Sequence, residues 1–188
     1  MNENTHLNLI GLVGKKRVGK DAIAQTLVRE YDFTQLAFAD LLKDAAIALN
    51  PIVGVDDDLM FLVRLATAVH GRGWEGTKAK YPEARSILQR LGTDVVRAVD
   101  EDFWVKALEA RLLATDGPVV VSDVRFENEA ALIRRYGGTV VRVTRHDAYR
   151  DLDDHASENV DGIPFDTEVV NEGTLADLEQ AVRSLIHS

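Results

Sequence analysis

The segment from Leu7 to Tyr31 constrains the fold more than any other part of the chain. It begins with the apolar run LNLIGLV, continues with the glycine- and lysine-rich stretch GKKRVGKD, and ends with apolar residues at helical spacing, namely Ile23, Leu27 and Tyr31. This pattern predicts a buried strand, a tight loop and an amphipathic helix in direct succession. A strand–loop–helix unit of this kind is typical of α/β proteins.

The rest of the chain continues the alternation of strands and helices. Further strands are expected at 34–38, 118–121, 139–143 and 167–170. Helices are expected at 41–49, 59–70, 83–97, 102–113, 126–136 and 175–186, with a turn-rich connection that leads into a helix start at 50–58 and a loop at 71–82. The sequence therefore predicts an α/β fold with a largely parallel sheet of five strands.

Composition narrows the class of protein. The chain has 188 residues, no cysteine and a formal net charge of −9, and its length predicts a single domain, 1–188. The lack of cysteine excludes disulfides, thiolate zinc sites and thiol nucleophiles. The acidic balance argues against binding along a nucleic-acid backbone. Because no apolar stretch is long enough to span a membrane and MNENTH is unlike a signal peptide, we expect a cytoplasmic protein with no nucleic-acid or membrane partner.

The residues between the first strand and helix have the composition of a phosphate-binding loop. Gly14 and Gly19 allow backbone conformations that turn successive N–H groups toward one concavity, and Lys20 can reach the terminal phosphates of a nucleotide. The spacing predicts a P-loop of the Walker A type, with contacts from Gly14, Lys16, Arg17, Val18, Gly19 and Lys20. The alternative is a glycine-rich turn with solvated lysines.

Two carboxylates are candidate Mg²⁺ ligands. Asp21 occupies the position from which a Ser or Thr hydroxyl ordinarily contacts Mg²⁺, although it could instead cap the helix. Asp123 ends the apolar run VVVS, where P-loop proteins place a second carboxylate, although an Asp there is also common as a turn residue. Arg125 would project from the same end of the sheet toward the transferring phosphate.

Several motifs together resemble the phage-type deoxynucleoside monophosphate kinases. They span about residues 7–182 in the family's order. The matching segments are GLVGKKRVGKDAIAQTL (11–27), FADLLKDAA (38–46), RSILQRLGTDVVR (85–97), FWV (103–105), SDVRFENEAALIRRYGGTVVRV (122–143), HASE (155–158) and VVNEGTLADLEQAV (169–182). In that family an Asp after the loop lysine is itself usual.

The resemblance implies a P-loop kinase fold of three layers, with an acceptor-binding helical region at about 40–100 and a lid at about 144–160. It implies transfer of the γ-phosphoryl group of ATP to a deoxynucleoside monophosphate, with Mg²⁺ as cofactor and small nucleotides as the binding partners. A phage-encoded enzyme would work in the host cytoplasm. The accepted bases, the selectivity between deoxyribose and ribose, and the oligomeric state stay open, a homodimer being one candidate.

The resemblance also implies where the acceptor binds. Arg85, Gln89 and Arg97 match the family's central motif, and Arg85 and Gln89 share a helix face at i, i+4, where one could bind phosphate and the other a base edge. Asp40, after the second strand, could orient the acceptor or cap the helix at 41–49. Trp74 could stack on a base or anchor its loop.

Further candidate site residues follow from the same resemblance. Arg145 is expected as the lid arginine, whereas Arg142 lies inside a strand and is expected to be structural. Asn171 and Gly173 are expected in a loop beside the adenine of ATP, where Asn171 could form local hydrogen bonds and Gly173 could let the backbone approach the ring. The alternative, which is compatible with the first, is a plain turn followed by a helix with Thr174 as its N-cap.

Two other functions are compatible with parts of the pattern. Related P-loop kinases that phosphorylate phosphomevalonate or dephospho-coenzyme A share the loop and the strand-end aspartate. A regulatory protein that binds ATP without an acceptor shares the loop alone, and the additional arginines argue against it.

Overall fold

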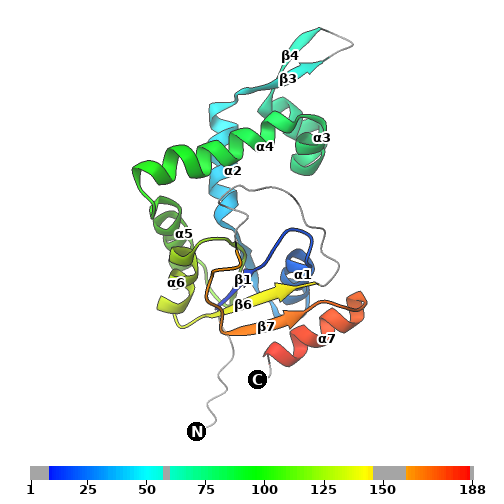
Figure 1. Cartoon of the computed structure of the whole chain (residues 1–188), viewed down its shortest axis with the longest axis vertical. Helices are drawn as coiled ribbons and strands as arrows, with labels where there is room; N and C mark the ends of the chain where they lie inside the picture. The colour runs from blue at the N-terminus through cyan, green and yellow to red at the C-terminus, as the bar shows by residue number, and fades with distance from the viewer. Residues whose placement is uncertain (1–8, 57–59, 146–159, 187–188) are drawn as a thin grey trace. The chain divides into compact units, whose positions relative to one another are not determined.

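A computed structural model describes residues 9–56, 60–145 and 160–186 of the chain (Figure 1). The chain forms two compact units: unit 1 comprises Met1–Phe38 and Val105–Ser188, and unit 2 comprises Ala39–Trp104. Unit 2 is therefore an insertion between the two parts of the sequence that build unit 1. Its bounds lie close to those of the helical region expected at about 40–100.

Unit 1 contains a five-stranded sheet in the order β2-β5-β1-β6-β7, with every neighbouring pair parallel. The strands are β1 (Leu9–Val13), β2 (Thr34–Leu36), β5 (Val119–Val124), β6 (Thr139–Thr144) and β7 (Thr167–Val170). The central strand β1 is buried at every position, whereas the edge strand β2 is mostly exposed. The predicted α/β class and the five parallel strands are confirmed.

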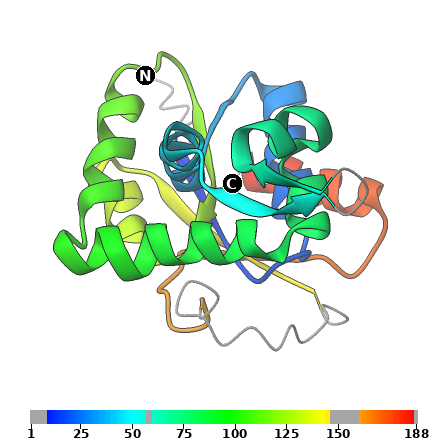
Figure 2. The same cartoon turned by 90° about the horizontal axis from the view of Figure 1, so that it is seen from above.

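Helices cover both faces of this sheet (Figure 2). They are α1 (Lys20–Tyr31), α5 (Phe103–Leu113), α6 (Glu127–Arg135) and α7 (Leu175–Ile186). Ile10 and Leu12 of β1 pack in one core cluster with side chains of α1 and α7. Gly11 faces α6, since a Cβ built on it would lie 2.8 Å from Cγ1 of Ile133. Alternate residues of β1 thus serve opposite faces and produce the expected three layers.

Unit 2 consists mainly of helices and has a core of its own. Its elements are α2 (Phe38–Leu49), β3 (Ile52–Asp56), β4 (Phe61–Arg64), α3 (Leu65–Lys80), α4 (Pro82–Gln89) and the π-helical segment η1 (Arg90–Arg97). Buried side chains that include Val53, Val63, Leu65 and Tyr81 form this core. An apolar cluster separate from that of unit 1 explains why the insertion forms a compact unit.

An antiparallel hairpin corrects the prediction for 50–70. Strands β3 and β4 pair from Ile52 opposite Arg64 to Asp56 opposite Phe61, where a turn-rich connection and the start of a helix were expected. Short apolar runs such as FLVR fit the strand and helix periods equally well. Their branched and aromatic side chains favour a strand once a partner strand is adjacent.

The prediction of a loop at 71–82 is also wrong, because most of this segment belongs to α3. The helix is interrupted at Gly73, whose φ of 66° and ψ of 175° are not helical. Thr77 is fully buried and its hydroxyl donates to the Gly73 carbonyl at 2.7 Å. Trp74 packs against the unit 2 core. Tertiary packing therefore overrides the low helix propensity of the three glycines.

The helix expected at 83–97 forms as α4 followed by the wider turns of η1. Gly92 is buried there, and its carbonyl accepts a hydrogen bond from Nε1 of Trp104 at 3.0 Å. A Cβ at position 92 would lie 2.8 Å from Cδ2 of Leu42. The glycine of the RSILQRLGTDVVR motif thus allows α2 to approach this turn closely.

Candidate active site

The candidate donor-site residues of unit 1 follow neighbouring strand ends. Val13, the last residue of β1, pairs with Val124 of β5 on one side and with Arg142 of β6 on the other. The residues that directly follow these strands and β7 are Gly14, Arg125, Arg145 and Asn171. All of them leave the sheet at its carboxyl-terminal edge, which is where α/β proteins bind ligands.

The backbone of the loop 14–19 favours glycine at positions 14 and 19. A Cβ on Gly14 would lie 2.3 Å from the carbonyl oxygen of Val143, and Gly14 has a φ of 155°. Gly19, which precedes α1, has a φ of 111°, and Arg17 is left-handed with a φ of 64°. Backbone conformations of this kind can turn successive N–H groups toward one concavity, and the phosphate contacts of the loop stay a prediction. The side chain of Val18 is buried beneath the loop.

Lys20 lies across the loop. Its Nζ donates to the carbonyl of Gly14 at 2.6 Å and to that of Lys15 at 2.7 Å. Lys20, the first residue of α1, thus holds its ammonium group against the loop, beside a helix N-terminus that carries partial positive charge. This geometry suits the neutralisation of a phosphate group.

Asp21 lies in the first turn of α1 and is exposed. The N-cap residue is Gly19, so Asp21 is not the cap of the helix. Its carboxylate is still favourable there because it faces the positive end of the helix dipole.

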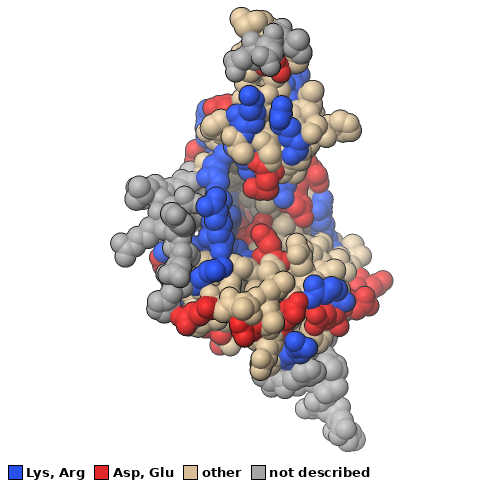
Figure 3. All heavy atoms as spheres, turned by 90° about the vertical axis from the view of Figure 1, so that its right-hand side faces the viewer, with Lys and Arg blue, Asp and Glu red and all other residues tan. Residues whose placement is uncertain are grey.

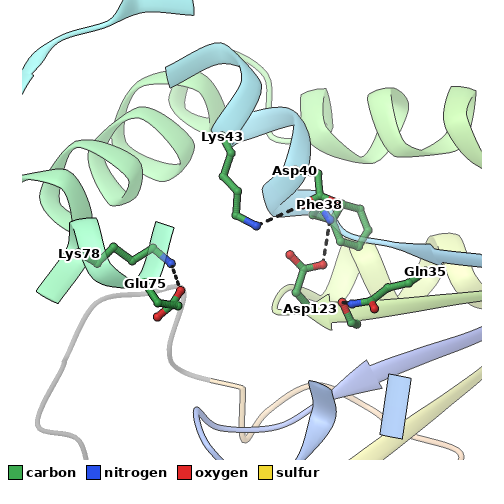
Figure 4. A network of polar contacts seen from close by, with 8 residues as sticks. Gln35, Phe38, Asp40, Lys43, Glu75, Lys78 and Asp123 are labelled. Atoms are coloured by element: carbon green, nitrogen blue, oxygen red, sulfur yellow. Dashed lines mark hydrogen bonds and ion pairs between the residues drawn. The ribbon is translucent and has the colours of Figure 1, made fainter. Parts of the chain in front are cut away.

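Asp123 fixes the connection that follows β2 (Figure 4). Its Oδ1 accepts a hydrogen bond from the backbone N–H of Phe38 at 2.8 Å, and Nε2 of Gln35 donates to the hydroxyl of Ser122 at 2.9 Å. The strand-end aspartate therefore has a structural role, and the metal role that the sequence predicts stays a prediction. A carboxylate held in this way is orientated before any ligand arrives.

Glu129 is a buried carboxylate that the sequence analysis missed. Only 2% of this residue is exposed, and its Oε2 accepts hydrogen bonds from the backbone N–H of Arg125 at 2.7 Å and of Phe126 at 3.2 Å. The side chain thus fixes the turn from which Arg125 projects. A glutamate three residues after the N-cap Phe126 is half of a capping box, and this spacing was the available signal.

We expect Glu129→Ala to lower the free energy of unfolding by about 2 kcal/mol, because two amides lose a buried acceptor. Glu129→Gln keeps an acceptor oxygen and should cost less than half as much. Urea unfolding of the wild type and both variants measures the difference. Equal losses in the two variants would contradict this role of the carboxylate.

Asn171 forms hydrogen bonds to other parts of the protein. It is 8% exposed, its Nδ2 donates to the carbonyl of Val18 at 2.8 Å, and its backbone N–H donates to the carbonyl of Thr144 at 2.8 Å. The side chain is therefore directed to the loop 14–19, at a residue 153 positions away in the sequence. The position of Asn171 beside the adenine of ATP stays a prediction.

Gly173 belongs to the cap of α7. The Oδ2 of Asp177 accepts hydrogen bonds from the backbone N–H and the hydroxyl of Thr174, at 2.7 and 2.8 Å. These bonds hold the pKa of Asp177 below its usual value. A Cβ on Gly173 would lie 2.3 Å from the same carboxylate oxygen. Thr174 also accepts from the backbone N–H of Asp177 at 3.4 Å, which agrees with the predicted cap.

The expected lid falls mostly outside the described residues, which end at Arg145 and resume at Val160, and the HASE segment (155–158) lies outside them as well. Arg145 is exposed directly after β6. Arg142 donates to the carbonyls of Asp161 and Ile163 at 2.9 and 3.1 Å, which agrees with the structural role expected for it.

The predicted acceptor residues all belong to unit 2. Asp40 lies in the first turn of α2 and its Oδ1 is 3.2 Å from Nζ of Lys43 (Figure 4). Because α2 begins at Phe38, Asp40 is not an N-cap. Trp74 is in helix α3 and not in a loop. The remaining members are Arg85 and Gln89, both half-buried in α4, and Arg97, whose Nη1 donates to the carbonyl of Glu101 at 2.9 Å.

Acidic side chains lie beside the loop 14–19 as well as elsewhere on the surface, since Oδ2 of Asp161 is 2.9 Å from Nζ of Lys15. Over the lower part of the face in Figure 3, Asp and Glu side chains lie among Lys, Arg and uncharged side chains. In the described part of the chain, no helix combines the length and the apolar character needed to cross a membrane.

Comparisons with known proteins agree with these observations. Residues 77–182 match the family model of deoxynucleotide monophosphate kinase. A protein of Acanthamoeba polyphaga mimivirus, described as a "putative deoxynucleotide monophosphate kinase", is 31% identical over 163 residues, which is 80% of each chain. Among solved structures, TT1252 from Thermus thermophilus is similar with a TM-score of 0.50 at 18% identity, covering 96% of this chain and 97% of its own. Shikimate kinase from Aquifex aeolicus gives a TM-score of 0.48 at 12% identity, with 94% of each chain covered.

The likeness to TT1252 concerns the fold alone, whereas the family model and the viral relative concern the sequence itself. The family model covers more than half of the chain, and the viral relative extends over four fifths of it. The chain therefore belongs to the deoxynucleotide monophosphate kinase family and is a nucleotide kinase.

Proposed function

We propose that this protein transfers the γ-phosphoryl group of ATP to a deoxynucleoside monophosphate and releases the deoxynucleoside diphosphate and ADP. The observation that carries this proposal is Lys20 held by two carbonyls across a glycine-bounded loop, at the end of the central strand of a chain of this family. Phosphoryl transfer needs positioning and charge neutralisation more than covalent help from the protein.

The loop 14–20 binds the phosphates of ATP in this proposal. Backbone N–H groups of the loop donate to phosphate oxygens, and Lys20 exchanges its bonds to the loop carbonyls for bonds to the terminal phosphates. Lys16 and Arg17 add positive charge beside them. Asn171 and Gly173 support the loop and the start of α7 at the nucleotide's edge.

Asp21 and Asp123 fit Mg²⁺ as this reaction would use it. Mg²⁺ takes one or two carboxylates together with substrate phosphates and keeps several waters. The described residues hold no cluster of three or more His, Asp or Glu that could bind a metal, so a Mg²⁺ ion held here would need phosphate oxygens and waters as its remaining ligands. When bound, Mg²⁺ neutralises charge on the phosphates that react.

Arg125 and Arg145 neutralise the charge that develops on the transferring group. Arg125 follows β5 directly beside the start of the loop, and Arg145 follows β6. Arg145 acts as the lid arginine, which completes the site when the lid closes and excludes water.

Unit 2 binds the acceptor. Arg85 and Gln89 lie one turn apart on α4, so a guanidinium can bind the acceptor phosphate while an amide reads a base edge. Asp40 orients the deoxyribose or base, with Arg97 and Trp74 as further contacts to the acceptor.

A panel of acceptors tests this function. The protein is mixed with ATP and Mg²⁺, ADP formation is followed, and each deoxynucleoside monophosphate, phosphomevalonate or dephospho-coenzyme A is added in turn. We expect at least one deoxynucleoside monophosphate to accelerate ADP release by about 10²-fold or more over the acceptor-free rate, because bound acceptor replaces water as the nucleophile. Acceleration only by the other acceptors, or by none of them, would refute the proposal.

A further inference from the structure

Asn171 is anchored on both its backbone and its side chain. The backbone N–H joins the end of β7 to the carbonyl of Thr144 at the end of β6, while Nδ2 donates to the carbonyl of Val18. The residue is 8% exposed, so a polar group has been brought out of water to make these bonds. Because the Val18 carbonyl can only accept, the amide nitrogen is the atom that must face it.

This hydrogen bond sets the direction of one peptide group in the loop. The peptide between Val18 and Gly19 is trans, and in a trans peptide the carbonyl and the N–H point in opposite directions. With the Val18 carbonyl directed to Asn171, the N–H of Gly19 is directed away from Asn171. In a phosphate-binding loop that is the donor at the start of the helix, where anions are bound.

The absence of a side chain at Gly19 leaves room for the side chain of Asn171. A Cβ on Gly19 would lie 2.6 Å from Nδ2 of Asn171, a distance that real Cβ atoms essentially never show. The φ of 111° at Gly19 independently favours glycine. The amide of Asn171 therefore packs directly on the peptide that it orients, and the side chain of Leu178 from α7 lies 3.5 Å from the same position.

We propose that Asn171 is a positioning residue of the phosphate-binding loop, which holds the Val18–Gly19 peptide so that the Gly19 N–H donates to the phosphates of ATP. The inference rests on the proposed use of this loop for ATP. It differs from a contact with adenine, because it assigns the effect of Asn171 to the phosphate end of the nucleotide. Substitution of Asn171 should therefore weaken the binding of a ligand that has phosphates and no base.

The test measures the binding of ATP and of inorganic tripolyphosphate to the wild type, Asn171→Ala and Asn171→Asp by calorimetry, together with kinetics. In Asn171→Ala the carbonyl of Val18 loses its donor, and we expect both ligands to bind about tenfold more weakly, the fold-change of one net hydrogen bond. Asn171→Asp keeps the shape and places a carboxylate oxygen against the carbonyl, so it should weaken binding further. The KM of the acceptor should stay within about twofold in both variants.

Asp166→Ala is the matched control for a loss of stability alone. Asp166 also binds a backbone amide, that of Val140 at 2.8 Å, but at the beginning of β6, the end of the strand opposite to the loop. This variant should lower the melting temperature and leave the affinity for ATP unchanged.

The outcomes separate this inference from the proposed function. Retention of ATP and tripolyphosphate affinity within twofold in both Asn171 variants would overturn the inference, as would a loss confined to ATP, which would indicate an adenine contact. A wild type that binds ATP but phosphorylates no deoxynucleoside monophosphate would refute the function and leave the role of Asn171 standing. A wild type that binds neither ligand would overturn both.

Discussion

Lys20→Ala is expected to lower kcat/KM by about 10²–10³-fold, the effect of removing one preorganised group that stabilises transition-state charge. The ammonium of Lys20 is held within 2.7 Å of two loop carbonyls, so it already lies at the loop when ATP arrives and has to exchange these bonds for bonds to phosphate. An alanine leaves the loop amides to bind phosphate without a compact positive charge. Steady-state kinetics with ATP and the preferred acceptor measure the loss.

Lys15→Ala is the control for removal of a positive charge from the same loop. Its Nζ forms an exposed ion pair with Asp161 at 2.9 Å, and its backbone carbonyl, which Lys20 uses, survives the substitution. Since exposed ion pairs contribute at most about 1 kcal/mol, kcat/KM should change by less than about fivefold. Equal effects of the two substitutions would show that only net charge matters, and would remove Lys20 from the catalytic residues.

The sequence predicts the sheet and the loop well because their signals are local. The run LIGLV has no polar side chain, so only a central strand covered on both faces can bury it. The sequence locates the loop through Gly14 and Gly19, because the backbone conformation and close contacts at both positions leave no room for a side chain. The closing helix at 175–186 is predicted with its observed bounds because its apolar spacing follows a capped turn.

The parts that the sequence does not predict depend on contacts between distant residues. Asn171 and Val18 are separated by 153 positions, and no periodicity connects an amide to one carbonyl so far away. The β3–β4 hairpin forms because two short apolar runs, which fit the helix and the strand period equally well, pair with each other as strands. Trp74 and Thr77 keep a glycine-rich segment helical through packing that appears only in the folded unit.

Arg125→Ala is expected to lower kcat by about 10³-fold, in the range found for arginines that neutralise charge on a transferring phosphoryl group. Val124 pairs with Val13, so the backbones of Arg125 and Gly14 leave the sheet as neighbours, and we expect the guanidinium to lie beside the loop. The buried Glu129 fixes the backbone N–H of Arg125 at 2.7 Å. This anchor does not depend on the arginine side chain, so the fold should tolerate its removal.

Two further variants show whether the guanidinium itself is responsible. Arg125→Lys keeps the charge but loses the planar fork of donors, so it should recover only part of the lost kcat. Arg134→Ala removes an arginine that binds Asp166 and the carbonyl of Pro164, and it should leave kcat unchanged. If Arg125→Ala raises only the KM of ATP, Arg125 binds the ground state and does not stabilise the transition state. The loss of kcat, with ATP affinity retained, is the result that the position of Arg125 beside the loop predicts.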